Sequence, residues 1–132
     1  MITKADEADY IHIVRAVQNK KLDYLTCAHI RQDISQKCLY KFTENNKIIA
    51  ICSIVFDEKY HYHAVKRLCI FSINNKGKHI TEKFLDFFSQ KGYKKIGCTP
   101  WSDNAPMRHI LEKKGFVLEY IFSEKWCFYS RS

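Results

Sequence analysis

Hydrophobic residues near the N-terminus recur at the spacing of amphipathic helices. Ile2–Lys4 is a candidate for a short first strand. One helix face follows at i, i+3, i+4 and i+7: Tyr10, Ile13, Val14 and Val17. Acidic residues at positions 6, 7 and 9 precede this face, where they stabilise the positive end of a helix dipole. A second, less regular helix is indicated by Leu22, Leu25, Ile30 and Ile34.

From Cys38 onward the pattern becomes that of strands. Residues 38–43 alternate between apolar and polar, and the Glu-Asn-Asn sequence at 44–46 is typical of a turn. The nearly unbroken apolar run at 47–56 predicts a strand that is buried on both faces. A polar turn at 57–59 leads into a further strand of roughly Tyr62–Ile73. These segments predict a hairpin followed by a third strand.

The last third of the chain returns to helices and strands in alternation. Apolar residues at helical spacing indicate a helix from Ile80 to near Gly92, and a strand follows at Tyr93–Thr99. The remaining predicted elements are a helix from about Asn104 that stops at Gly115, and strands at Phe116–Ile121 and Lys125–Tyr129. The order β-α-α-β-β-β-α-β-α-β-β predicts an α/β domain with a mixed, mostly antiparallel sheet.

Length and composition narrow the class of protein. A chain of 132 residues, 46% hydrophobic and 27% charged, predicts one globular domain over residues 1–132. No apolar run reaches the roughly 20 residues of a membrane span, and the N-terminus lacks the apolar core of a signal peptide, so we expect a cytoplasmic protein with no membrane partner. The six cysteines show no metal-type spacing, so we interpret them as reduced thiols and expect no metal.

The net charge of +8 is unevenly distributed. Residues 61–95 contain eight Lys and Arg side chains against two acidic ones. Such a cluster attracts an anion, either a nucleic acid backbone or a phosphorylated small molecule. A solvated surface that aids solubility explains the same charge.

Three segments together resemble the GNAT superfamily of acyl-CoA-dependent N-acetyltransferases. Met1–Tyr10 is similar to the opening strand and helix start of that family, and Leu68–Ile80 to its central strand and pyrophosphate loop. Asp103–Phe116 (DNAPMRHILEKKGF) is similar to its penultimate helix and is the most specific match. The resemblance implies a GNAT-like fold, a mixed and mostly antiparallel central sheet flanked by about four helices, and acetyl-CoA as co-substrate.

The resemblance also implies where acetyl-CoA would bind. The end of the central strand would pair with the pantetheine arm, the loop would hold the pyrophosphate, and Asn104 would lie near the thioester. The corresponding residues are Cys69, Ile70, Phe71, Ser72, Asn74, Asn75, Lys76, Gly77, Lys78, His79 and Asn104. The chain departs from the family pattern at Asn74, at His79, and at Leu111, where many members carry a thiolate-protonating Tyr. Gly77→Glu is expected to abolish CoA binding.

Acetyl transfer needs a group that accepts the proton of the ammonium. His63 is the first candidate base because an unperturbed imidazole titrates near neutrality, and His61 would share its strand face. Asp57 and Glu58 are alternatives in the preceding turn. Tyr120, on the final hairpin that borders the acceptor cleft in the family, is the first candidate acid, and Cys98 and Thr99 at the end of their predicted strand are alternatives.

Three functions stay open at this point. The favoured one is direct transfer of an acetyl group from acetyl-CoA to an amine, on a small molecule or a peptide, in a ternary complex. The first two helices, their connection around Asn19–Leu22 and the hairpin loop near Tyr120–Glu124 would then select the acceptor. The alternatives are a basic nucleic-acid-binding module, and a CoA-binding domain with little or no catalysis.

Overall fold

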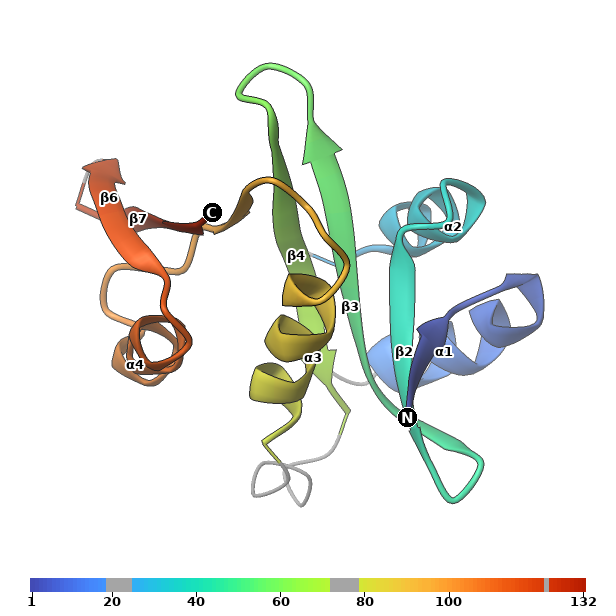
Figure 1. The fold of residues 1–132 in the computed structure, drawn as a ribbon. Helices are drawn as coiled ribbons and strands as arrows, with labels where there is room; N and C mark the ends of the chain where they lie inside the picture. The colour runs from blue at the N-terminus through green and yellow to red at the C-terminus, as the bar shows by residue number, and fades with distance from the viewer. Residues whose placement is uncertain (19–24, 72–78, 123) are drawn as a thin grey trace. The chain divides into compact units, whose positions relative to one another are not determined.

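The computed structural model of the chain describes residues 1–18, 25–71, 79–122 and 124–132. Its helices are α1 (Tyr10–Gln18), α2 (Cys27–Ser35), α3 (Ile80–Ser89) and α4 (Ala105–Lys113), with a short 3-10 turn, η1 (Glu7–Asp9), before α1. Its strands are β1 (Ile2–Lys4), β2 (Leu39–Glu44), β3 (Lys47–Asp57), β4 (Tyr62–Ile70), β5 (Ile96–Cys98), β6 (Val117–Phe122) and β7 (Trp126–Arg131). Figure 1 shows these elements along the chain.

The described strands form one seven-stranded sheet in the order β1-β2-β3-β4-β5-β7-β6. β4 and β5 pair in parallel, whereas β1 with β2, β2 with β3, β5 with β7 and β6 with β7 are antiparallel. The predicted fold class, a mixed and mostly antiparallel sheet with four helices, is confirmed. No helix among the described residues is long and apolar enough to cross a membrane.

The chain divides into two compact units, and β3 and β4 run through both. The first unit comprises Met1–Ile54 and Lys66–Ile80, and the second comprises Val55–Val65 and Thr81–Ser132. The prediction of a single domain over residues 1–132 stays a prediction.

The core of the first unit lies between α1, α2 and the sheet, and Figure 1 shows the two helices beside β2. The predicted apolar face of α1 is buried, with Ile13 fully inaccessible, and Ile30 and Ile34 of α2 join it. Burying such side chains contributes about 1.5–3 kcal/mol each. Asp6 caps η1 in a capping box with Asp9, and Asp9 also accepts a hydrogen bond from Lys41 at 2.8 Å. Asp6 and Asp9 therefore cap the turn before α1, and Asp9 also anchors it to β2.

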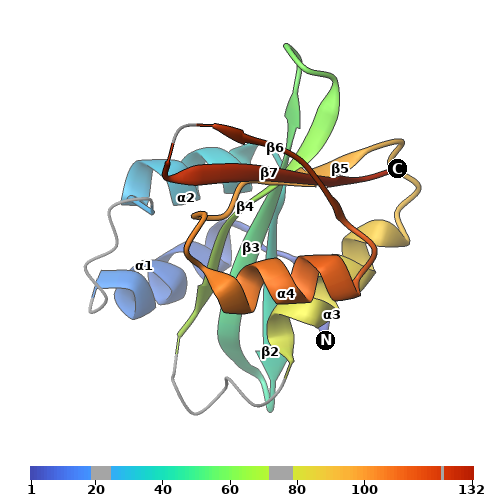
Figure 2. The same cartoon turned by 90° about the vertical axis from the view of Figure 1, so that its left-hand side faces the viewer.

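The second unit contains α3, α4 and the strands β5, β7 and β6, which Figure 2 shows from the side. Phe84, Leu85 and Phe88 bury the inner face of α3. Ion pairs join the end of α4 to α3, and one of them places Lys114 Nζ 3.0 Å from Asp86 Oδ2. Arg108 of α4 donates to the Tyr129 hydroxyl at 2.9 Å and to the Ser102 carbonyl at 2.8 Å, which ties α4 to β7.

Several element boundaries differ from the predicted ones by one or more residues, and β4 ends at Ile70, before the predicted Ile73. β5 covers Ile96–Cys98 instead of Tyr93–Thr99, because only three residues pair with β7. α3 ends at Ser89, and Gly92 with φ +80° lies in the turn that follows. His61 adopts a left-handed φ of +54° in the β3–β4 turn, so it lies before β4 and not on a strand face with His63.

Candidate active site

A pocket of about 290 Å³ opens in the second unit at the N-terminal ends of β4 and β5. Its lining consists of five aromatic and three charged side chains: Asp57, Tyr60, Tyr62, Lys95, Glu119, Tyr120, Phe122 and Phe128. They come from the end of β3, the β3–β4 turn, the start of β4, the residue before β5, and the β6–β7 hairpin. An aromatic wall with a few charged groups is typical of a small-molecule site.

Gly97 of β5 makes the aromatic wall possible. A Cβ atom at this position would lie 2.6 Å from the Tyr62 ring and 2.7 Å from the Phe128 ring. Because glycine has no side chain, the two rings approach across β5 to a centroid separation of 5.2 Å in edge-to-face geometry. Tyr120 extends the wall, with its ring 5.3 Å from Phe128.

Two of the charged groups of the pocket, Lys95 and Glu119, form an ion pair, and the third, Asp57, accepts a backbone hydrogen bond. Lys95 Nζ lies 3.2 Å from Glu119 Oε1, which also accepts a hydrogen bond from Ser130 Oγ at 2.7 Å. The Ser130 hydrogen bond, and secondarily the Lys95 ammonium, hold the pKa of Glu119 below its ordinary value, against the opposing effect of burial. Asp57 Oδ1 accepts the Tyr60 backbone N–H at 3.0 Å, which fixes the β3–β4 turn. Both carboxylates are therefore oriented by the fold.

Burial raises the pKa of the Tyr62 phenol, and the negative charge of Asp57 adds to the effect. The phenol therefore remains protonated at neutral pH and can donate a hydrogen bond.

The two predicted catalytic residues lie in different surroundings. Tyr120 lines the pocket. The His63 ring instead stacks on Tyr93 at 4.0 Å and lies 4.9 Å from the Phe56 ring, because successive strand residues such as Tyr62 and His63 point to opposite faces. Burial lowers the pKa of His63. Asp57, one of the two alternative bases, is in the pocket, and Glu58 is not among the residues that line it.

Most of the predicted acetyl-CoA loop lies outside the described residues, namely Ser72, Asn74, Asn75, Lys76, Gly77 and Lys78. Of the others, Cys69 is buried in the first unit's core and Ile70 is half-buried. Phe71 packs against this core and donates its N–H to the Ile49 carbonyl at 2.9 Å. His79 is exposed, with φ +54°, directly before α3. Asn104 caps α4 by accepting the Met107 N–H at 3.2 Å.

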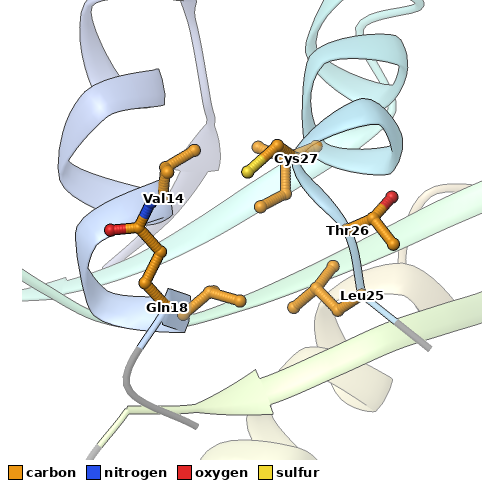
Figure 3. Close-up of a pocket in the computed structure, with 7 residues that line it drawn as sticks. Val14, Gln18, Leu25, Thr26 and Cys27 are labelled. Carbon is orange, nitrogen blue, oxygen red and sulfur yellow. The ribbon is translucent and has the colours of Figure 1, made fainter. Parts of the chain in front are cut away.

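A second, smaller pocket of about 180 Å³ lies between α1 and α2 in the first unit (Figure 3). Val14, Gln18 and Leu25 line it together with Cys27, the first residue of α2. Residues 19–22, predicted to help select the acceptor, lie outside the described residues. Among the described residues, the lining is mostly apolar, and its polar members are Gln18, Thr26 and Cys27.

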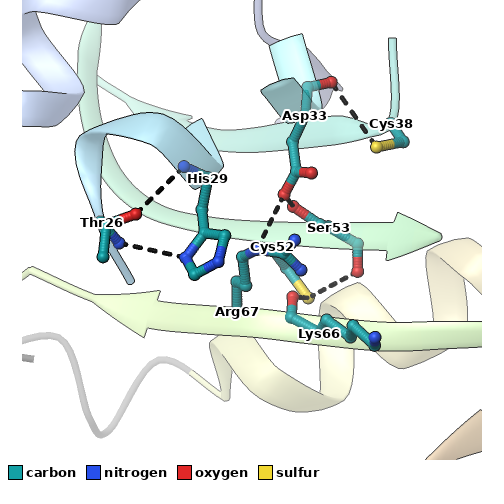
Figure 4. Close-up of polar contacts among 8 residues, drawn as sticks. All are labelled: Thr26, His29, Asp33, Cys38, Cys52, Ser53, Lys66 and Arg67. Carbon is teal, nitrogen blue, oxygen red and sulfur yellow. Dashed lines mark hydrogen bonds and ion pairs between the residues drawn. The ribbon is translucent and has the colours of Figure 1, made fainter. Parts of the chain in front are cut away.

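Sequence reasoning did not find a buried polar cluster in the first unit (Figure 4). Asp33 of α2 is 1% exposed, and it accepts a hydrogen bond from Ser53 Oγ of β3 at 2.6 Å. Arg67 Nε of β4 lies 3.2 Å from the same carboxylate oxygen, close enough for an ion pair although its N–H is not aligned for a hydrogen bond. The sequence did contain a signal for a buried carboxylate, because Asp33 lies on the same helix face as the apolar residues Ile30 and Ile34.

The cluster joins α2 to β3 and to an irregular point of β4, since Arg67 has a left-handed φ of +55°. Burial, and then the negative charge of Asp33, raise the pKa of the neighbouring Cys38 thiol to about 11. This thiol is consequently protonated and unreactive at neutral pH.

No protein-family model and no curated protein matches the sequence of this protein. Its structure, by contrast, is similar to many solved ones. A GNAT-family acetyltransferase from Streptococcus agalactiae superposes with a TM-score of 0.83 at 16% identity, over 99% of this chain and 94% of that one. An N-acetyltransferase from Staphylococcus aureus superposes with a TM-score of 0.81 at 15% identity, over 100% of this chain and 96% of that one.

A third similar structure is an acetyl transferase from Salmonella typhimurium that modifies the N-terminal serine of a ribosomal subunit protein. It superposes with a TM-score of 0.78 at 15% identity, over 98% of this chain and 92% of that one. Coverage is nearly complete on both sides in all three cases. The resemblance drawn from the sequence is thus confirmed at the level of structure: this chain has the fold of the GNAT-family acetyltransferases.

Proposed function

We propose that the protein transfers an acetyl group from acetyl-CoA to an amine acceptor, directly and in a ternary complex. The observation that carries this proposal is the pocket that Tyr62 and Tyr120 line, within a fold whose solved examples are acetyltransferases. The pocket lies at the start of the central strand and against the final hairpin, where the resemblance places the acceptor. An N-terminal amine of a protein is one acceptor type, by analogy with the Salmonella enzyme.

The proposed reaction forms one bond and breaks one. The amine nitrogen, after loss of its proton, attacks the thioester carbonyl, a C–N bond forms and the C–S bond breaks. The products are an acetamide, CoA thiol and a proton, because the departing thiolate takes up one proton and the amine releases two. The protein therefore has to accept protons from the nitrogen and supply one to the sulfur.

Tyr120 keeps its predicted role of acid in this proposal because its ring lies in the pocket. Asp57, one of the two predicted alternative bases, lines the same pocket, where its carboxylate can orient the amine and receive its proton. His63 stays a candidate base, and its contact with Tyr93 means that it would act through water and not by direct contact in the pocket.

Acetyl-CoA supplies the activated acetyl group in this reaction. We place it along Cys69–Phe71, the loop up to His79, and Asn104. His79 fits this assignment because it is exposed at the N-terminal end of α3, where helix dipoles favour the phosphates of a ligand. The basic residues between positions 61 and 95 add to that attraction.

Two measurements test the function. The first is thermal unfolding with and without acetyl-CoA, with ATP as an anion control at two salt concentrations. A ligand at about 100 times its Kd stabilises by about 2.7 kcal/mol, which is a shift of several degrees for this size. The second is release of CoA thiol with a panel of amines.

Each result points to one function. A shift specific to acetyl-CoA with thiol release supports the transferase. A shift without release for any amine supports a CoA-binding domain without turnover. A shift that ATP reproduces and salt abolishes, together with salt-sensitive binding of nucleic acid, would favour the basic binding module instead.

A further inference from the structure

We infer that the pocket recognises its acceptor by positive charge, as an alkylammonium group held by aromatic faces and carboxylates, and that Lys95 occupies part of this site when no acceptor is bound. The inference rests on the proposed function only in calling the ligand an acceptor. It adds a substrate class and a residue, Lys95, that sets specificity.

The aromatic lining is the first reason. Tyr60, Tyr62, Tyr120, Phe122 and Phe128 surround the pocket, and adjacent rings meet at steep or tilted angles, with Tyr120 and Phe122 at 80° and 4.6 Å. Rings arranged in this way present faces and edges in several directions. Ring faces carry negative potential and attract ammonium ions, whereas neutral ligands gain only apolar contact from them.

The balance of charge is the second reason. Two carboxylates, Asp57 and Glu119, and a single cation, Lys95, line the pocket of a protein whose net charge is +8. The charged side chains of the lining therefore sum to −1 in a basic molecule, and a second ammonium, that of Lys59, lies 5.2 Å from the centroid of the Tyr60 ring. The raised pKa of the Tyr62 phenol agrees with the negative sum, since the charge of Asp57 contributes to it after burial.

Lys95 itself shows the preference of the site. Its ammonium lies 5.7 Å from the centroid of the Phe128 ring and 3.2 Å from Glu119, so an alkylammonium of this chain already makes both kinds of contact. The Lys95 side chain is 35% exposed to solvent, so it has room to move away from the pocket. A bound cation would share the carboxylates with Lys95 and be repelled by it, so Lys95 weakens acceptor binding.

The first test measures binding of tetramethylammonium and of tert-butanol by chemical-shift titration of the intact protein. The two probes have nearly the same shape, and only the first is charged. Tetramethylammonium has no N–H or O–H, so it cannot be acetylated and its binding needs no acetyl-CoA. We expect it to bind about tenfold more tightly than tert-butanol.

Variants assign the binding to this pocket. Lys95→Met is expected to tighten tetramethylammonium binding at least threefold, whereas Lys47→Met, at an exposed position at the start of β3, leaves it unchanged. Tyr120→Leu is expected to weaken it about tenfold, and Phe56→Leu serves as the control because Phe56 is equally exposed and lies outside the pocket. The thermal midpoint of each variant shows that it is folded.

The outcomes separate this inference from the proposed function. Equal affinity for the two probes, or no effect of Lys95→Met in a folded protein, overturns charge recognition even if acetyl transfer is observed. Selective binding of tetramethylammonium that responds to both variants upholds the inference even if no amine is acetylated, and in that case the proposed function fails alone.

Discussion

At the scale of single residues, the candidate site depends on the absence of a side chain at Gly97. Gly97 has no side chain, and the Tyr62 and Phe128 rings occupy the space that a side chain at this position would need. The aromatic wall and the backbone of β5 are therefore coupled.

Gly97→Ala is expected to destabilise the protein by about 1–3 kcal/mol and to weaken tetramethylammonium binding, because the added methyl group displaces both rings. Gly92→Ala is the matched control. Nothing lies within 4 Å of a Cβ at Gly92, so its cost comes from the left-handed φ of +80° alone, about 1 kcal/mol. Denaturant unfolding of both variants checks this, and an equal loss of stability with unchanged pocket binding would contradict the role given to Gly97.

His63 makes a pH-dependent contribution to stability. Burial lowers its pKa below 6.5, so the unfolded state binds more protons than the folded state in the range just below that pH. We expect the free energy of unfolding to fall as the pH drops from 6.5 toward the pKa of His63 in the folded state. The free energy of unfolding of His63→Gln is expected to fall less steeply over the same range. Parallel pH profiles for the two proteins would show that the imidazole is not buried in this way.

The same substitution separates the structural role of His63 from catalysis. If His63 is the base, the rate of acetyl transfer in the wild-type protein falls on acidification with a midpoint below 6.5, and this limb disappears in His63→Gln. A limb that persists in the variant would assign proton acceptance to another group, and Asp57→Asn would then be the next variant to measure.

At the scale of elements, a buried charge holds the first unit together. Asp33 joins α2 to β3 through Ser53 and to β4 through Arg67, and all three side chains are mostly or fully buried. Such a cluster costs free energy to bury, but it costs more to leave incomplete, because the remaining cation and hydroxyl lose their partner.

Asp33→Ala is consequently expected to destabilise the protein by about 3–5 kcal/mol. Lys113→Ala is the control, since its ion pair with Glu82 is 3.4 Å long and its side chain is 56% exposed, so its loss costs at most about 1 kcal/mol. Chemical denaturation measures both values. Equal costs would mean that the cluster is hydrated and contributes no more than a surface pair.

At the scale of the whole molecule, the proposed function requires a separate site for an anionic co-substrate besides the acceptor pocket. We predict that Gly77→Glu removes the thermal shift caused by acetyl-CoA and leaves the unliganded midpoint unchanged, because a carboxylate at this position of the proposed pyrophosphate loop would repel phosphate. Gln90→Glu adds the same charge at an exposed turn after α3 and should keep the shift. A full shift in Gly77→Glu would exclude this loop from the acetyl-CoA site.

Much of this architecture could be predicted from local patterns. The i, i+3, i+4, i+7 spacing from Tyr10 to Val17 identified α1, the apolar run at 47–56 identified β3, and Asn104 with Pro106 marked the start of α4. Helix faces, strand alternation and caps depend on residues close in sequence, so the chain alone encodes them. The ends of β5 depend on pairing with β7, which lies about 30 positions further along the chain, and local spacing does not report that pairing.

The sequence by itself determined the order of elements, the fold they imply and the basic character of residues 61–95. Only the tertiary structure decided that Tyr62, Lys95 and Glu119 share a pocket, that His63 stacks on Tyr93 outside it, and that Asp33 meets Ser53 and Arg67. The physical reason is the same in each case. Side-chain chemistry at a site depends on burial and on neighbours that are distant in sequence, and these are set when strands pair and helices pack.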